Sequence, residues 1–187
     1  MTTTNNSNET SRLISLLLER SVTRGDFVLA SGRRSSYYID ARRTTMSGEG
    51  QLLIGALGVA ALDEQGWAPR AVGGLTLGAD PVAYAIAHAA RRAGRSIDAF
   101  TVRKEAKGHG LGRRIEGCLA AGDPVVVVED VITTGHSALE AVAQVRQAGG
   151  EVLGVLAVVD REEGGREAIA AGGVGVTALV LAAELRV

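Results

Sequence analysis

The sequence has little cysteine, proline, lysine or aromatic side chain. Its 187 residues include one cysteine, three prolines and only 3% aromatic residues. The single cysteine, Cys118, excludes an internal disulfide, so a reducing cytoplasm is the expected compartment. A small apolar role suits this side chain better than that of a catalytic thiol. No apolar run has the length that a membrane span requires.

Charge of one sign is not in excess either. The 20 basic and 21 acidic residues leave a net charge of -1, which gives no general attraction to nucleic acid or to a membrane surface. Residues 1–9 are rich in Thr, Asn and Ser and lack the basic start and apolar centre of a signal peptide. We therefore expect no nucleic-acid or membrane partner, and a disordered lead-in over residues 1–8.

Apolar patterning predicts a single α/β domain over residues 9–187. Residues 9–45 form a small N-terminal addition, with a helix over 9–22 and two short strands at 27–29 and 37–39. The core, residues 46–187, opens with a helix over 47–65.

Strands and helices then alternate along the core. The predicted strands are apolar runs at residues 71–75, 97–102, 125–128, 152–159 and 177–181, and the predicted helices cover 81–93, 137–148 and 163–171. Short apolar runs without alternation are typical of strands buried on both faces. Their alternation with helices predicts a central parallel sheet flanked by helices, which binds ligands outside the carboxyl ends of its strands.

A run of four valines at residues 125–128 ends in two acids. Glu129 and Asp130 are followed by a loop of small and hydroxyl-bearing residues that opens the next helix. Helix N-termini present free backbone N–H groups and the positive end of the helix dipole, so this loop predicts a phosphate site. The paired carboxylates can bind ribose hydroxyls and stabilise positive charge on a sugar ring. An ordinary helix cap beside two solvated acids explains the arrangement less well.

This segment resembles the phosphoribosyl diphosphate (PRPP) motif of type I phosphoribosyltransferases. The resemblance implies their fold, contacts of Glu129 and Asp130 with the ribose hydroxyls, a catalytic role for Asp130, and a loop that holds the 5′-phosphate. The PRPP-binding set that it implies is Glu129, Asp130, Val131, Ile132, Thr133, Thr134, Gly135, His136 and Ser137. It also implies Mg²⁺ that arrives on PRPP and has no direct protein ligand.

The chain's only two lysines, Lys104 and Lys107, share one short segment with Arg103 and His109. Cations followed by glycines are typical of a mobile lid over a charged leaving group. The segment resembles the catalytic loop Arg-Lys-Glu-x-Lys-x-His-Gly of orotate phosphoribosyltransferases. The resemblance implies a catalytic lid loop (residues 103–112) in a homodimer. Arg103, Lys107 and His109 would reach the PRPP of the neighbouring site, and Lys104 would serve the chain's own site.

A third segment, Asp160-Arg161-Glu162-Glu163-Gly164, is similar to the Asp-Arg-x-Glu-Gly of the same family. The resemblance implies that Arg161 pairs with the orotate carboxylate, for which a planar bidentate donor is suited. From the residues alone, Arg161 could equally form a surface ion pair with Glu162 or Glu163.

A fourth segment, residues 31–37, is similar to the family's Ser-Gly-x-x-Ser-x-Tyr hairpin. The resemblance implies a hood over orotate with Tyr38 near the base, while Thr133 completes the implied orotate site. For Tyr37, packing on the core is an equally good interpretation. The implied reaction joins orotate to PRPP with release of diphosphate, a step of pyrimidine biosynthesis.

Three positions depart from the common family pattern. Ala30 and Leu77 stand where many members have Lys, and Gly108 replaces a common Asp. Because two cationic contacts are missing, lower turnover or affinity is expected. Just beyond the lid loop, we expect Arg113 and Arg114 to be solvated.

Two other functions are also compatible with the sequence. One is a phosphoribosyltransferase for a purine or for uracil, although Arg161 and the Arg-Lys-Glu lid weigh against it. The other is a non-catalytic PRPP sensor that regulates transcription or attenuates RNA. The sequence shows no appended DNA-binding domain or large basic surface, which weighs against a sensor.

Overall fold

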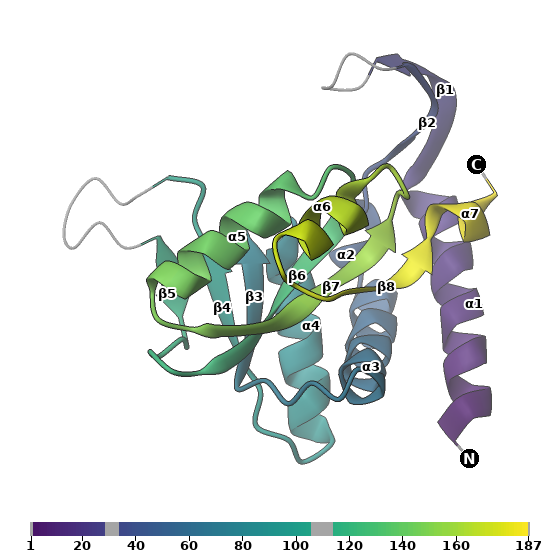
Figure 1. Cartoon of the computed structure of the whole chain (residues 1–187). Helices are drawn as coiled ribbons and strands as arrows, with labels where there is room; N and C mark the ends of the chain where they lie inside the picture. Colours follow the sequence, from purple (N-terminus) through teal and green to yellow (C-terminus); the bar gives the residue numbers. More distant parts are fainter. Residues whose placement is uncertain (1, 29–33, 106–113, 187) are drawn as a thin grey trace.

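A six-stranded sheet in the order β5-β4-β3-β6-β7-β8 forms the centre of the computed structural model, which describes residues 2–28, 34–105 and 114–186 (Figure 1). The parallel strands are β3 (Ala71–Leu75), β4 (Asp98–Val102), β6 (Pro124–Ile132), β7 (Glu151–Asp160) and β8 (Val176–Leu181). The edge strand β5 (Ile115–Gly117) is antiparallel to β4. The predicted α/β fold with a central parallel sheet is confirmed, and the short strand β5 is an addition to it.

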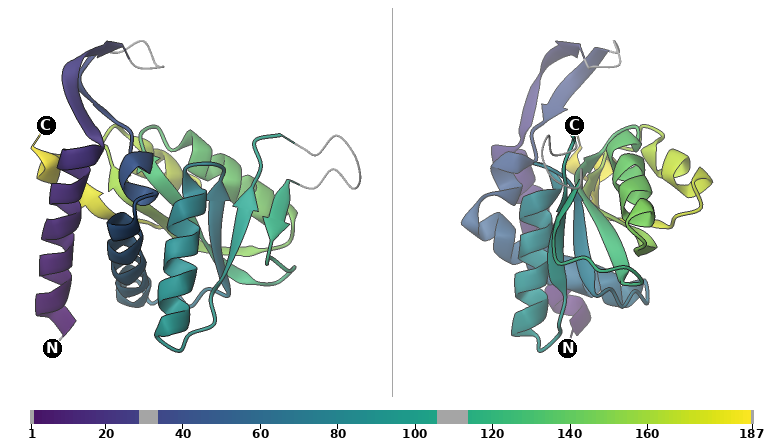
Figure 2. Two further views of the ribbon diagram at one scale, coloured as in Figure 1. Left: turned by 180° about the vertical axis from the view of Figure 1, so that it is seen from behind. Right: turned by 90° about the vertical axis from the view of Figure 1, so that its left-hand side faces the viewer.

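Helices cover both faces of this sheet (Figures 1 and 2). One face carries α3 (Gly48–Glu64) and α4 (Ala79–Arg92), with α1 (Thr2–Arg20) beside them, and the other carries α5 (His136–Gln147) and α6 (Gly165–Ala171). Two four-residue helices, α2 (Arg42–Thr45) and α7 (Ala182–Leu185), complete the set. Within the part of the chain described here, no helix is long and apolar enough to cross a membrane.

The central strand β6 explains why both faces need helices. Val126 and Val128 pack into the core on the α3–α4 side, and Val125 and Val127 pack into the core on the α5–α6 side. All four side chains are fully buried, and each such burial stabilises the fold by about 1.5–3 kcal/mol. The run of four valines is thus apolar because neither face of the strand meets water.

The first helix is longer than the sequence predicts. Residues 2–8, which we expected to be disordered, form the start of α1. Helix extension adds one backbone hydrogen bond for each residue that it fixes, so a polar segment can continue a helix that is already anchored. Leu13, Leu16 and Leu17 supply that anchor, since all three are fully buried.

An antiparallel hairpin of β1 (Val22–Val28) and β2 (Arg34–Ile39) stands apart from the main sheet and projects from the body of the molecule (Figure 1). The predicted strands at residues 27–29 and 37–39 covered only part of it, because cross-strand pairing extends back to Val22 and Ile39. The residues at the end of β2, Tyr38 and Ile39, line a cavity at the edge of the main sheet.

Candidate active site

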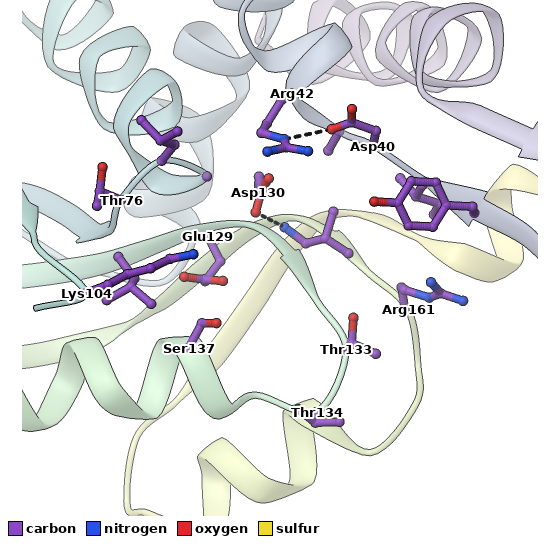
Figure 3. Close-up of a pocket in the computed structure, with 17 residues that line it drawn as sticks. Asp40, Arg42, Thr76, Lys104, Glu129, Asp130, Thr133, Thr134, Ser137 and Arg161 are labelled. Atoms are coloured by element: carbon purple, nitrogen blue, oxygen red, sulfur yellow. Dashed lines mark hydrogen bonds and ion pairs between the residues drawn. The ribbon is translucent and has the colours of Figure 1, made fainter. Parts of the chain in front are cut away.

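A cavity of about 590 Å³ opens where β3, β6 and β7 end (Figure 3). This is the edge at which parallel sheets bind ligands. Side chains from several predicted segments meet in it. The lining residues are Tyr38, Ile39, Asp40, Ala41, Arg42, Leu75, Thr76, Leu77, Gly78, Lys104, Glu129, Asp130, Val131, Thr133, Thr134, Ser137 and Arg161.

The two acids lie inside strand β6, because the strand continues to Ile132 instead of ending at the valines. Glu129 is only 6% exposed. Burial, with a smaller contribution from the charge of Asp130, raises the pKa of Glu129 to about 8. Burial also raises the pKa of Asp130, against the hydrogen bond that the Val131 N–H donates to its Oδ1 atom. The cavity therefore favours a ligand that brings positive charge to these carboxyl groups.

The loop after β6 forms a smaller cavity of about 220 Å³, lined by Glu129 and residues 131–138. Gly135, directly before α5, has a φ of 78°, a left-handed conformation that favours glycine. A Cβ atom there would also lie 2.8 Å from the carbonyl oxygen of Gly165. The tight turn aims the N-terminus of α5 into this cavity, as expected for a phosphate site.

Arg161 is buried rather than part of a surface ion pair. Its side chain is 5% exposed, and its Nη2 atom lies 2.8 Å from Oε1 of Glu163. The guanidinium carbon lies 4.7 Å from the ring centroid of Tyr37, and Nη2 lies 3.5 Å from the Ser35 hydroxyl. In the described part of the chain, the buried Nε atom has no hydrogen-bond partner. A buried donor without a partner is costly, so this side of the cavity is suited to an anionic acceptor.

Tyr37 and Tyr38 are neighbours on strand β2, where successive side chains point to opposite faces. Tyr38 lines the cavity and is 44% exposed. Tyr37 points the other way, is half-buried and packs against the core. The interpretation that Tyr37 packs on the core is confirmed, and its ring also lies against Arg161.

The cationic segment is described only at its two ends. Lys104 lines the main cavity and extends toward Glu129 (Figure 3). Arg103 lines a neighbouring cavity of about 520 Å³, to which Lys104 also contributes, and its Nη1 atom lies 3.5 Å from Oε1 of Glu116. Lys107, His109 and Arg113 lie outside the described residues, as do Ala30, Gly108 and residues 31–33 of the hairpin segment.

Arg114 is not solvated, contrary to expectation. Its side chain is 19% exposed. It donates hydrogen bonds to the carbonyl oxygens of Arg103 and Lys104 and to the carboxylate of Glu140. The cause is the pairing of β5 with β4, which a charge pattern does not reveal. The Arg103 N–H also donates to the Arg114 carbonyl (2.7 Å). Backbone pairing therefore holds Arg114 beside the start of the cationic segment.

Sequence reasoning missed two groups of polar contacts, one in the main cavity and one in the neighbouring cavity. Arg42 Nε lies 2.8 Å from Oδ1 of Asp40, and both residues line the main cavity. Asp80 accepts hydrogen bonds from the hydroxyls of Thr76 (2.6 Å) and Thr101 (2.8 Å), so one carboxylate ties the end of β3 to β4. The sequence does mark Asp80 as an acid at the start of a predicted helix, but this position indicates only a favourable interaction with the helix dipole.

Comparison with known proteins places this geometry in a family. No protein-family model matches the chain. It is 49% identical over 180 residues to the orotate phosphoribosyltransferase of Aquifex aeolicus, covering 95% of this chain and 97% of the relative. It is 51% identical over 177 residues to that of Mycobacterium avium, covering 95% and 96%.

A solved structure gives the same result. The crystal structure of Mycobacterium tuberculosis orotate phosphoribosyltransferase in complex with PRPP matches with a TM-score of 0.82 and 45% identity, covering 96% of this chain and 99% of that one. A chain that is about half identical to these enzymes over nearly their whole length, and that folds as one of them does, belongs to the orotate phosphoribosyltransferase family.

Proposed function

We propose that this chain transfers the phosphoribosyl group of PRPP to the ring nitrogen of orotate and releases diphosphate, within the cytoplasmic synthesis of pyrimidine nucleotides. The observation that supports this best is the composition of one cavity. An acid pair, a phosphate loop at a helix N-terminus and a buried arginine with an unpartnered donor all face it. These groups match a ribose, a phosphate and a carboxylate respectively.

In this reaction the bond between C1′ and the diphosphate oxygen breaks, and the electron pair leaves with the diphosphate. Orotate's ring nitrogen forms the new bond to C1′ and loses its proton. Glu129 and Asp130 hold the ribose hydroxyls and, when ionised, stabilise positive charge on the ring. Residues 131–137 hold the 5′-phosphate at the start of α5. The chain thus acts mostly by positioning and electrostatic stabilisation.

Orotate binds between Arg161, Tyr38 and Thr133. The guanidinium of Arg161 pairs with the orotate carboxylate, and the unpartnered Nε supplies a donor that Glu163 and Ser35 leave free. Tyr38 lies on the hood side of the same cavity, where its exposed ring can cover the base. This arrangement favours a base that carries a carboxylate over uracil or a purine.

Mg²⁺ fits this cavity as an ion that PRPP carries in. Among the residues that the structure describes, no group of three or more His, Cys, Asp or Glu side chains could hold a metal. Glu129 and Asp130, which line the cavity, would hold the ribose hydroxyls, and the phosphate oxygens of PRPP together with water would supply the ligands of the ion. When bound, the ion neutralises the charge that grows on the diphosphate.

The active unit in this proposal is a homodimer in which the lid loop reaches the neighbouring site. Lys104 lines both the main cavity and the neighbouring one, whereas Arg103 lines only the neighbouring one, so Arg103 is turned away from the chain's own acid pair. Leu77, in the loop before α4, lines the main cavity, and Tyr84, on α4, lines the neighbouring one. Arg103, Lys107 and His109 would then neutralise the partner's diphosphate.

The test is the loss of orotate absorbance when the protein is mixed with orotate, PRPP and Mg²⁺. We expect a decrease that requires all three additions. A flat signal from protein that still binds PRPP would refute orotate as the acceptor. A panel of purines and uracil, followed by nucleic acids, would then identify a different acceptor or a non-catalytic PRPP sensor.

A further inference from the structure

Arg114 joins two parts of the site that are far apart in the sequence. Its Nε atom donates to the Arg103 carbonyl at 2.8 Å, and its Nη2 atom donates to the Lys104 carbonyl at 2.6 Å. The same Nη2 atom pairs with Glu140 on α5. One guanidinium therefore connects the backbone at the start of the cationic segment to the helix that begins at the phosphate loop.

The two connected parts approach opposite ends of the proposed PRPP molecule. Lys104 extends into the main cavity toward the acid pair (Figure 3). Glu140 lies in the second turn of α5, whose first residues, His136 and Ser137, line the phosphate cavity. Arg114 therefore lies between the backbone that carries Lys104 and the helix that begins at the phosphate loop.

We propose that Arg114 is a positioning residue for PRPP, which holds Lys104 in register with the phosphate loop through the Arg114–Glu140 clasp. The clasp is the set of contacts from Arg114 to Glu140 and to the carbonyls of Arg103 and Lys104. This inference depends on the proposed function only in taking PRPP as the ligand. Arg114 acts through Lys104, not through the ligand itself.

The chemistry of the clasp requires an arginine. A guanidinium offers five N–H donors in a rigid plane, so it can serve two carbonyls and a carboxylate at once. The side chains of Arg114 and Glu140 are only 19% and 30% exposed, so water competes poorly for these contacts. A lysine keeps the charge but cannot reproduce this fork, and a loosened Lys104 loses the preorganisation on which binding depends.

Steady-state kinetics and PRPP titration calorimetry on Arg114→Ala and Arg114→Lys test the proposal. We expect both variants to raise the KM and the Kd for PRPP on the order of tenfold, as hydrogen bonds to charged groups predict. The KM for orotate should change far less. Arg146→Ala is the matched control, because Arg146 is an exposed arginine at the other end of the same helix. It should match the wild type.

The decisive measurement is a double-mutant cycle with Lys104→Ala. If Arg114 acts through Lys104, then Lys104→Ala combined with Arg114→Ala binds PRPP no more weakly than Lys104→Ala alone. Additive losses would overturn the proposal. So would Arg114→Lys with wild-type PRPP affinity.

Hydrogen exchange separates this inference from the proposed function, because it needs no ligand. Backbone amides of residues 99–105 should exchange faster in Arg114→Ala than in the wild type or in Arg146→Ala. Unchanged exchange would overturn the clasp even if the protein consumes orotate. Conversely, a wild type that binds PRPP without consuming orotate refutes the proposed acceptor and leaves the affinity comparison decisive for Arg114.

Discussion

The buried carboxyl group of Glu129 leads to a prediction about the stability of the ligand-free protein, which should fall as the pH rises from about 5 to about 8. Burial is the main cause of its raised pKa, and the neighbouring charge of Asp130 adds to it. The unfolded chain has neither effect, so its Glu129 titrates near the ordinary value of 4.5. Folding therefore changes the affinity of this one group for a proton.

The magnitude follows from the two pKa values. Between 4.5 and about 8, the native state retains a proton that the unfolded state has released, so rising pH favours unfolding. The difference between 8 and 4.5 is about 3.5 units, and each unit corresponds to about 1.4 kcal/mol. The full loss approaches about 5 kcal/mol and is complete above pH 8. Asp130, whose pKa burial also raises, adds a loss of the same sign.

Glu129→Gln isolates this effect, because glutamine has nearly the shape of the protonated acid and does not titrate. Urea unfolding can be followed by the fluorescence of Trp67, the only tryptophan, which packs against the core. Near pH 5 the variant and the wild type should have similar free energies of unfolding. At pH 8.5 the variant should be more stable by up to about 5 kcal/mol. Protein concentration and ionic strength are held fixed, because subunit association would otherwise shift the result.

A stability difference that does not change with pH would refute this reasoning, since it would mean that Glu129 titrates alike in both states. Glu151→Gln provides the control. Glu151 is an exposed acid at the start of β7, so its replacement should leave the pH dependence of the wild type intact. A loss of slope in this control would assign the effect to net charge and not to the burial of Glu129.

Three further predictions concern single side chains in or near the site. Arg161→Leu should raise the KM for orotate about a hundredfold, because a charged hydrogen bond is worth about 1.5–3 kcal/mol, and should spare the KM for PRPP; an equal rise in both constants would argue against the carboxylate contact. Lys107→Ala should lower kcat on the order of a hundredfold with an unchanged urea midpoint, and wild-type kcat would remove Lys107 from the lid. Asp80→Asn leaves only one carbonyl acceptor for the hydroxyls of Thr76 and Thr101. The free energy of unfolding should therefore fall by about 1 kcal/mol, and the KM for PRPP should rise. Equal stability of variant and wild type in urea unfolding would contradict this account.

The sequence predicted the strands best where burial is complete. The valines of β6 marked a central strand because both of its faces are covered. The extent of β6 was less predictable, since the apolar run stops at residue 128 and Glu129 and Asp130 indicated the end of the strand. In the structure, β6 remains paired with β7 as far as Ile132, which lies opposite Asp160. Because β6 pairs with β7 beyond the valines, Glu129 and Asp130 lie within the sheet, and their raised pKa values follow from that burial.

Polar contacts between segments that are distant in the chain could not be predicted from the sequence. Arg114 and Glu140 are 26 residues apart, and nothing in either neighbourhood links them. Their contact depends on the antiparallel return of β5, a strand of three residues that is too short for a period to be seen. The pairing of Asp40 with Arg42 is local, yet its place in the cavity depends on the hairpin reaching the sheet. Motifs thus predicted many of the side chains that line the cavity, whereas topology determined which other side chains contact them.

The local sequence did not determine which acid forms an ion pair with Arg161. Glu162 and Glu163 both follow it directly, and composition cannot choose between them. The backbone makes the choice: Glu162 has a φ of 57°, and its carboxylate accepts a hydrogen bond from the Ala183 N–H at the start of α7 (2.8 Å). Glu163 is left to approach Arg161. The arginine therefore keeps one carboxylate partner and an unpartnered Nε in the described part of the chain, and a second acid at its side would have competed with an anionic ligand for those donors.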